Sequence, residues 1–219
     1  MRTPRLIDLS HRLDSRTPTY PGYPSVEIQL LETTRFGQVD GRRALNSSRV
    51  SVGLHCGTHM DAPFHFYEEG RTIDQVPIGQ CMGPALVIDL GEASRAGTIE
   101  VGHLQVQRER LRRVQKVILN MSWSRRWGKP EYFTDHPVLS GDAAQFLVDC
   151  GVELVGIDAP SVDRPPFPAH LVLLGNGAII VENLTNVDSI ESELFTLVVL
   201  PLALTAREAS PVRAIAIEE

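Results

Sequence analysis

The segment from His55 to His65 carries the residue types from which proteins build metal sites. It reads His-Cys-Gly-Thr-His-Met-Asp-Ala-Pro-Phe-His, so three imidazoles and one carboxylate fall within eleven positions. A His-x3-His spacing alone is weak evidence, and this one lacks the glutamate of the helical zinc-protease motif. Gly57 and Pro63 also oppose a regular helix, which indicates a loop that wraps its side chains around one point.

Imidazole and carboxylate side chains together form a ligand set suited to zinc, manganese or iron. We expect His55, His59 and Asp61 to be such ligands, with coordination positions left for water. Buried together without a cation, these groups and His65 would leave unpaired charge and unsatisfied polar atoms. The sequence therefore predicts a divalent metal site.

Glu182 interrupts an otherwise apolar run, 178–184, which is typical of a buried strand. A lone buried carboxylate is costly, so it needs an arginine, a backbone donor or a metal as its partner. His170 lies twelve residues upstream, and its neighbours at 168–172 also suggest an apolar strand. A hairpin through residues 175–177 would place His170 near Glu182.

Strands and helices are expected to alternate along the rest of the chain. Period-two alternation at 26–31 indicates a half-buried strand, and a strand at 49–54 would deliver the chain to His55. This order predicts one α/β domain over residues 1–219, with a mixed sheet. Further buried strands are expected at 85–90, 117–120, 154–157 and 194–200, and helices at 102–113 and 140–150.

Composition and charge exclude several classes of protein. The 219 residues carry a formal net charge of -6, with 42% hydrophobic and 22% charged residues, as in an ordinary globular chain. Net negative charge argues against a nucleic-acid partner, and the most apolar segment, 194–204, is too short to cross a bilayer. Three cysteines without paired spacing, and an N-terminus without signal-peptide features, favour a cytoplasmic address.

The string His-x-Gly-Thr-His-x-Asp-x-Pro-x-His-Phe, at 55–66, is similar to the hallmark of the cyclase-like metal hydrolases. This family includes bacterial kynurenine formamidase and isatin hydrolase. The chain also resembles it in Tyr20-Pro21-Gly22, in the stretch 156–163, and in the spacing of His170 and Glu182. The resemblance covers nearly the whole chain, and it implies a barrel-like mixed sheet with flanking helices, of the swivelling β/β/α type.

The resemblance also implies which residues hold metal. A first divalent ion would be bound by His55, His59 and Asp61, while Asp61 and Glu182 would bridge to a second ion that His170 also holds. A paired divalent site lowers the pKa of a bound water. The cofactor is therefore expected to be one or two ions per chain, with Zn²⁺ and Mn²⁺ equally compatible.

Hydrolysis of a small amide by metal-activated water is the activity that the resemblance implies, with N-formylkynurenine-type aryl formamides as leading substrates. His65 would be the acid/base, and Tyr20 would contact the substrate, although a surface tyrosine fits the sequence equally well. Alternatives are a cyclic amide or lactone, as for isatin hydrolase, and a non-catalytic metal-binding or polyketide-cyclase-like protein. A homodimer or homotetramer is expected, with a small-molecule substrate and no membrane partner.

Overall fold

A mixed sheet of eight strands forms the centre of the computed structural model, which describes residues 3–34 and 45–219. The continuous apolar runs of the sequence supply its central strands, because a strand covered on both faces needs apolar residues on both. In chain order the eight strands are β1 (Arg5–Asp8), β4 (His59–Asp61), β5 (Met82–Asp89), β7 (Lys116–Asn120), β9 (Leu154–Ile157), β10 (Ile179–Glu182), β11 (Leu194–Pro201) and β12 (Ala209–Glu218).

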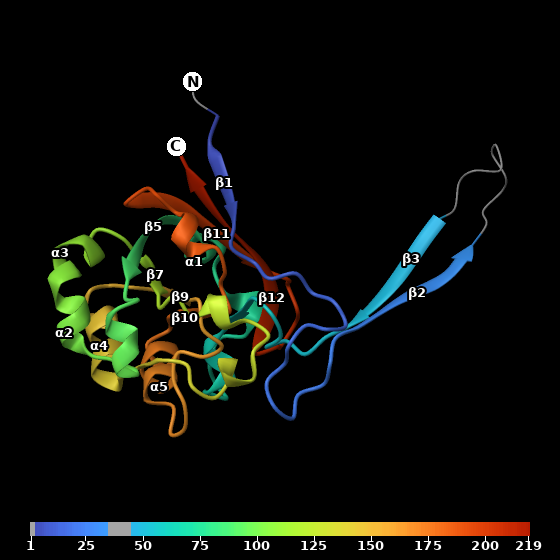
Figure 1. Cartoon of the computed structure of the whole chain (residues 1–219), viewed down its shortest axis with the longest axis horizontal. Coiled ribbons are helices and arrows are strands. Elements are labelled where there is room, and N and C mark those ends of the chain that lie inside the picture. The colour runs from blue at the N-terminus through green and yellow to red at the C-terminus, as the bar shows by residue number, and fades with distance from the viewer. Residues whose placement is uncertain (1–2, 35–44) are drawn as a thin grey trace.

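The sheet closes on itself. Its strand order is β1-β12-β11-β5-β7-β9-β10-β4, and β4 also pairs with β12. All of these strands except β1 therefore form a barrel, and β1 extends the sheet beside β12 (Figure 1). The strands β5, β7, β9 and β10 run parallel to one another, whereas every pairing that involves β11, β12, β4 or β1 is antiparallel.

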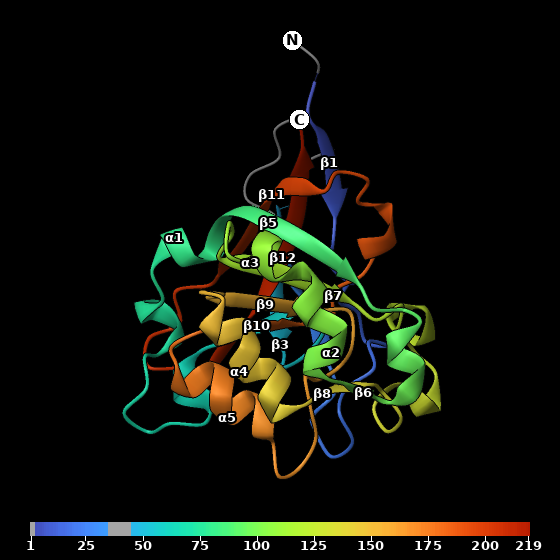
Figure 2. The ribbon, with the colours of Figure 1, turned by 90° about the vertical axis from the view of Figure 1, so that its left-hand side faces the viewer.

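Helices cover one side of this barrel, as the two views of the ribbon show (Figures 1 and 2). The expected barrel-like mixed sheet with flanking helices is thereby confirmed. No helix in the described part of the chain is long and apolar enough to cross a bilayer. The helices are α1 (Ile78–Cys81), α2 (Val101–Leu104), α3 (Arg108–Leu111), α4 (Gly141–Asp149) and α5 (Pro168–Gly175), and a separate two-stranded sheet joins β6 (Thr98–Ile99) to β8 (Val138–Leu139).

The helix expected at 140–150 is confirmed, because α4 spans Gly141–Asp149. The Ser140 hydroxyl caps α4 by accepting the Ala143 N–H at 3.2 Å. The helix expected at 102–113 is wrong as a continuous element. It is divided into α2, a 3-10 turn and α3. Only Leu104 and Leu111 of this stretch are buried, so no continuous apolar stripe holds it as one helix.

Successive side chains of the barrel strands point to opposite faces, so the barrel wall separates two apolar cores. One lies inside the barrel and the other lies between the barrel and the helices. On β7, Val117 and Leu119 pack toward the helices, whereas Ile118 points into the barrel. On β10, Ile180 likewise packs with the helix-side core, and its neighbours Ile179 and Val181 pack with the barrel core. Period-two alternation therefore decides which side chains of each strand can reach the helices.

The segment at 168–172 is the first half of helix α5 rather than the expected strand. Pro168 occupies the first helical turn, where its missing N–H costs nothing. The buried positions Ala169, His170, Leu173 and Leu174 recur at helical spacing. The expected hairpin that would join His170 to Glu182 is therefore wrong, and α5 crosses over to β10 instead.

A two-stranded arm projects from the barrel, formed by β2 (Glu27–Thr34) and β3 (Leu45–Ser51) (Figure 1). The strand expected at 26–31 exists, but its expected half-burial is wrong. Val26 at its base is buried, whereas Ile28 and Leu30 are 47% and 66% exposed. The reason is that this strand leaves the barrel, so that its alternating apolar face is not covered by the described residues.

A substitution on β7, a strand in the middle of the sheet, tests whether the barrel interior is an apolar core. Replacing Ile118 by Ala should lower the free energy of unfolding by about 2–5 kcal/mol, because it leaves a cavity inside the barrel. Val106→Ala is the control, since Val106 is 77% exposed, and its effect should stay within about 0.5 kcal/mol. Urea denaturation measures both, and equal effects would contradict the assigned barrel core.

Candidate metal and active site

The pairing of β4 with β10 brings the candidate ligands together. These antiparallel strands place His59 directly opposite Glu182, and Asp61 opposite Ile180. Residues two apart share a face of a strand, so His59, Asp61 and Glu182 all project to the same side. That side is the one on which α5 lies, and α5 carries His170. Three elements far apart in the sequence thus supply one cluster.

The donor atoms of this cluster lie at distances typical of ligands that share an ion. His59 Nε2 lies 3.4 Å from Glu182 Oε2 and 3.5 Å from Asp61 Oδ1. His170 Nε2 lies 3.5 Å from Glu182 Oε1 and 3.9 Å from Asp61 Oδ2. Two donors bonded to one zinc ion at tetrahedral angles stand about 3.4 Å apart. The geometry therefore suits a divalent cation between these four side chains.

Unsatisfied polar atoms support the same conclusion. His59 Nδ1 lies 2.9 Å from the Gly57 carbonyl, so this nitrogen carries a hydrogen and Nε2 is the atom that can donate a lone pair to a metal once it has lost its proton. Within the described residues, His59 Nε2 and both carboxylate oxygens of Asp61 are buried without a hydrogen-bond partner. Such atoms are costly to bury. A divalent cation would satisfy all three, so the residues present fit one.

The imidazoles and carboxylates of the cluster shift one another's pKa. Burial lowers the pKa of His59, but the carboxylates of Asp61 and Glu182 outweigh this and raise it to about 9. Burial raises the pKa of Asp61, but His55 and His59 outweigh it and hold that pKa well below its usual range. The carboxylates thus attract positive charge to this point, and a metal ion would compete for it with protons on the imidazoles.

His55 and His65 stand at the more exposed edge of the cluster. His55 Nδ1 lies 2.9 Å from Asp61 Oδ1, although without the geometry of a hydrogen bond. The ring centroids of His55 and His65 are 4.2 Å apart, and together with Asp61 they offer donor atoms within 4.8 Å of one another. The burial of His65 lowers its pKa. Its imidazole is therefore neutral at neutral pH and able to accept a proton.

A cavity of about 350 Å³ opens beside the cluster. Its wall contains Tyr20, and the Tyr20 ring packs edge-on against Phe133 at a centroid distance of 5.3 Å. Burial raises the pKa of Tyr20, so its hydroxyl keeps its proton. The aromatic residues that sequence reasoning missed on this wall are Tyr23, Phe66 and Phe167.

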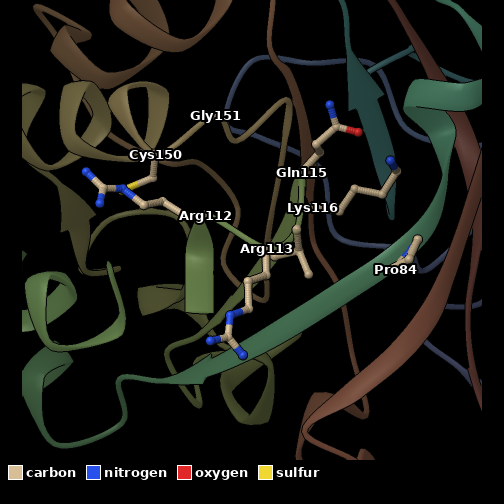
Figure 3. Close-up of a pocket in the computed structure, with 8 residues that line it drawn as sticks. Pro84, Arg112, Arg113, Gln115, Lys116, Cys150 and Gly151 are labelled. Carbon is tan, nitrogen blue, oxygen red and sulfur yellow. The ribbon is translucent and has the colours of Figure 1, made fainter. Parts of the chain in front are cut away.

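A different cavity, of about 360 Å³, lies at the amino ends of β7 and β9 (Figure 3). Arg112, Arg113, Gln115 and Lys116 line it. The candidate metal cluster lies at the other end of these parallel strands, beside the carboxyl end of β10. The two cavities are therefore separate, and only the one beside β10 contains the predicted ligands.

A network of hydrogen bonds connects the residues next to His59 and Glu182. The Thr58 hydroxyl accepts the His11 N–H at 2.9 Å and donates to the Asn183 carbonyl at 2.6 Å. The Tyr132 hydroxyl donates to Asn183 Oδ1 at 2.8 Å. Asn183 has a positive φ of 57°, directly after Glu182. Thr58 and Asn183 adjoin predicted ligands in the sequence, but no sequence signal connects them to Tyr132.

Solved structures share this fold. Isatin hydrolase A from Labrenzia aggregata superposes with a TM-score of 0.84 at 23% identity, over 98% of this chain and 94% of that one. A structure described as a predicted metal-dependent hydrolase from Bacillus stearothermophilus gives 0.80 at 24% identity, over 100% of both chains. The barrel with one helical side therefore defines the class of α/β protein to which the chain belongs.

Sequence comparison identifies the family within this class. Residues 7–164 match the family model described as "Putative cyclase". Kynurenine formamidase of Bacillus cytotoxicus is 33% identical, and that of Bacillus mycoides is 32% identical, each over 98% of both chains. The chain belongs to this cyclase family. The resemblance expected from residues 55–66 is thereby confirmed.

Binding of a divalent metal should raise the free energy of unfolding, and this gain should depend on the carboxylate of Asp61. For the wild type, Zn²⁺ at a hundred times its dissociation constant should raise the free energy of unfolding by about 2.7 kcal/mol. Asp61→Asn removes a charge from the centre of the cluster and should abolish most of this gain. Asp149→Asn, at an exposed position, should retain it. Denaturation with and without Zn²⁺ measures the gain, and an equal gain in Asp61→Asn would refute the assigned site.

Proposed function

We propose that this chain is a metal-dependent hydrolase of small aryl amides, with N-formylkynurenine-type formamides as its substrates. The observation that carries the proposal is the ligand cluster of His59, Asp61, His170 and Glu182 beside a cavity with an aromatic wall. A cavity of this size accommodates a single aromatic ring and its amide. Full-length relatives that are kynurenine formamidases support the same substrate class.

One or two divalent ions per chain, Zn²⁺ or Mn²⁺, are the proposed cofactor. When bound, such ions lower the pKa of water and polarise a carbonyl oxygen. The imidazole and carboxylate donors suit both metals. The residues proposed to hold the ions are His55, His59, Asp61, His170 and Glu182.

His65 is the proposed acid/base of the reaction. Its burial lowers its pKa, so the neutral imidazole accepts a proton from the attacking water. The same nitrogen then returns the proton to the leaving amine. Tyr20 and Phe167 flank the cavity and would hold the aryl ring of the substrate, which orients its amide toward the cluster.

Activity measurements test these roles. The wild type should hydrolyse N-formylkynurenine, and complete removal of metal should abolish this activity, with recovery when Zn²⁺ or Mn²⁺ is added. His65→Ala should lower kcat by about 10²–10⁴-fold, with the metal content of the protein unchanged. His103→Ala is the matched control, because His103 lies on α2, away from the cavity lining. Turnover that survives metal removal, or is unchanged in His65→Ala, would refute the proposal.

The same assay separates the alternative substrates. Isatin and simple lactones would be opened by the same attack on a carbonyl, so a panel of formamides, isatin and lactones is measured on one preparation. Faster turnover of isatin or a lactone than of any formamide would replace the aryl formamide as the substrate. Metal binding without turnover of any member of the panel would favour a non-catalytic protein.

A homo-oligomer, as a dimer or tetramer, is also proposed. The arm of β2 and β3 exposes Ile28, Leu30 and Val50, which are 47%, 66% and 57% exposed. A two-stranded hairpin is marginally stable by itself in water. A second copy of the chain would cover these apolar side chains and hold the arm in place.

Sedimentation measures this association. The wild type should sediment as a dimer or tetramer, and Leu30→Asp should shift it toward the monomer, because a charge would be buried in the interface. Leu6→Asp is a control on β1, where an apolar side chain is likewise exposed, at 67%, and it should leave the assembly intact. A monomeric wild type would exclude the proposal.

We also propose that residues 1–219 form one domain and that the protein is located in the cytoplasm. Strands near both ends of the chain, β1 and β12, pair in the same sheet. The cysteines Cys56, Cys81 and Cys150 are free and buried, as in proteins of reducing compartments.

A further inference from the structure

The stretch 156–163 leaves β9 and passes along the candidate site. Pro160 and Ser161 line the cavity, and the Val162 N–H donates to Glu182 Oε1 at 3.0 Å. The last residue of the stretch, Asp163, has its side chain 2% exposed. It lies outside the proposed ligands, and the reaction described above gives it no role.

The two carboxylate oxygens of Asp163 have different partners. Oδ2 accepts the backbone N–H of Ala169 at 2.6 Å and that of His170 at 3.1 Å. These donors belong to the first turn of α5, whose N-cap residue, Phe167, makes no side-chain cap. Oδ1 lies 2.6 Å from His170 Nδ1. One oxygen therefore caps the helix, and the other holds the imidazole ring that the helix carries.

The contact at Oδ1 selects one tautomer of His170. A carboxylate can only accept, so Nδ1 carries the hydrogen and Nε2 presents its lone pair. Nε2 is the atom that faces Asp61 and Glu182. We propose that Asp163 is a positioning residue, which fixes the ring and tautomer of His170 so that Nε2 can bind metal. This inference rests on the proposed metal site.

An asparagine at position 163 would disturb this arrangement without changing its shape. If its amide oxygen faces the helix, its NH2 group faces Nδ1 and favours the tautomer with hydrogen on Nε2, which cannot bind metal. If it is turned around, its NH2 group opposes the N–H groups of α5. Partners of this kind typically contribute 10–100-fold to the metal affinity of the histidine they orient.

Zn²⁺ affinity is the readout. Metal-free full-length protein is titrated with Zn²⁺ against a chromophoric chelator, for the wild type, Asp163→Asn and Asp142→Asn. We expect Asp163→Asn to weaken Zn²⁺ binding by about 10–100-fold. Asp142 is the matched control, since it is an exposed aspartate in the first turn of the neighbouring helix α4. Its substitution should leave the affinity unchanged, and wild-type affinity in Asp163→Asn would overturn the inference.

A double-mutant cycle separates positioning from helix capping. If Asp163 acts through His170, then Asp163→Asn should weaken binding no further when His170 is already Ala. An additive loss in the double variant would show that Asp163 acts only on the fold. Thermal unfolding of the metal-free variants measures the capping contribution by itself. Where Asp163→Asn does not fold, Asp163→Glu takes its place in the cycle, because it keeps both acceptor oxygens but displaces them.

The nitrogen chemical shifts of the imidazole provide a second measurement. The metal-free protein is measured at a pH high enough for the imidazole to be neutral, since only the neutral ring has a tautomer. There His170 of the wild type should show the hydrogen on Nδ1, and in Asp163→Asn the signal should move toward the other tautomer. An unchanged tautomer would refute the inference even if affinity fell. Failure of the wild type to bind Zn²⁺ would instead refute the proposed metal site, so the two failures are distinguishable.

Discussion

The register of β4 against β10 is the constraint on which the rest of the site depends. It sets His59 opposite Glu182 and turns Asp61 to the same side. A shift of one residue would reverse every side chain of β4. Met60, which now fills the barrel core, would then face the helices, and His59 and Asp61 would be buried in an apolar interior. Packing of Met60 and Val181 thus secures the position of the charged groups.

Much of the site could be predicted because its first half is local. His55, His59 and Asp61 lie within one short segment, so their residue types and spacing were sufficient to indicate a metal site. Glu182 was detectable as a carboxylate inside an apolar strand. His170 was paired with it correctly in space, since their Nε2 and Oε1 atoms are 3.5 Å apart, but for the wrong reason. A short apolar run does not distinguish a buried strand from a buried helix.

The parts that escaped prediction depend on contacts between distant segments. Tyr23, Phe66 and Phe167 meet only because their loops converge on one cavity. Strand β12 contains Pro211 and Arg213, and its small residues give little hydrophobic alternation, so it was not recognised. The arm was mistaken for a half-buried strand, because alternation shows which side chains share a face but not whether another layer covers it.

Strand β4 has a consequence for the order in which the protein can be completed during synthesis. It is three residues long, and both of its neighbours, β10 and β12, are encoded in the last fifth of the chain. A strand this short has no stability of its own. The ligands on β4 therefore acquire fixed positions only after the ribosome has released the C-terminal strands. A nascent chain therefore cannot assemble the full cluster before β10 and β12 have emerged from the ribosome.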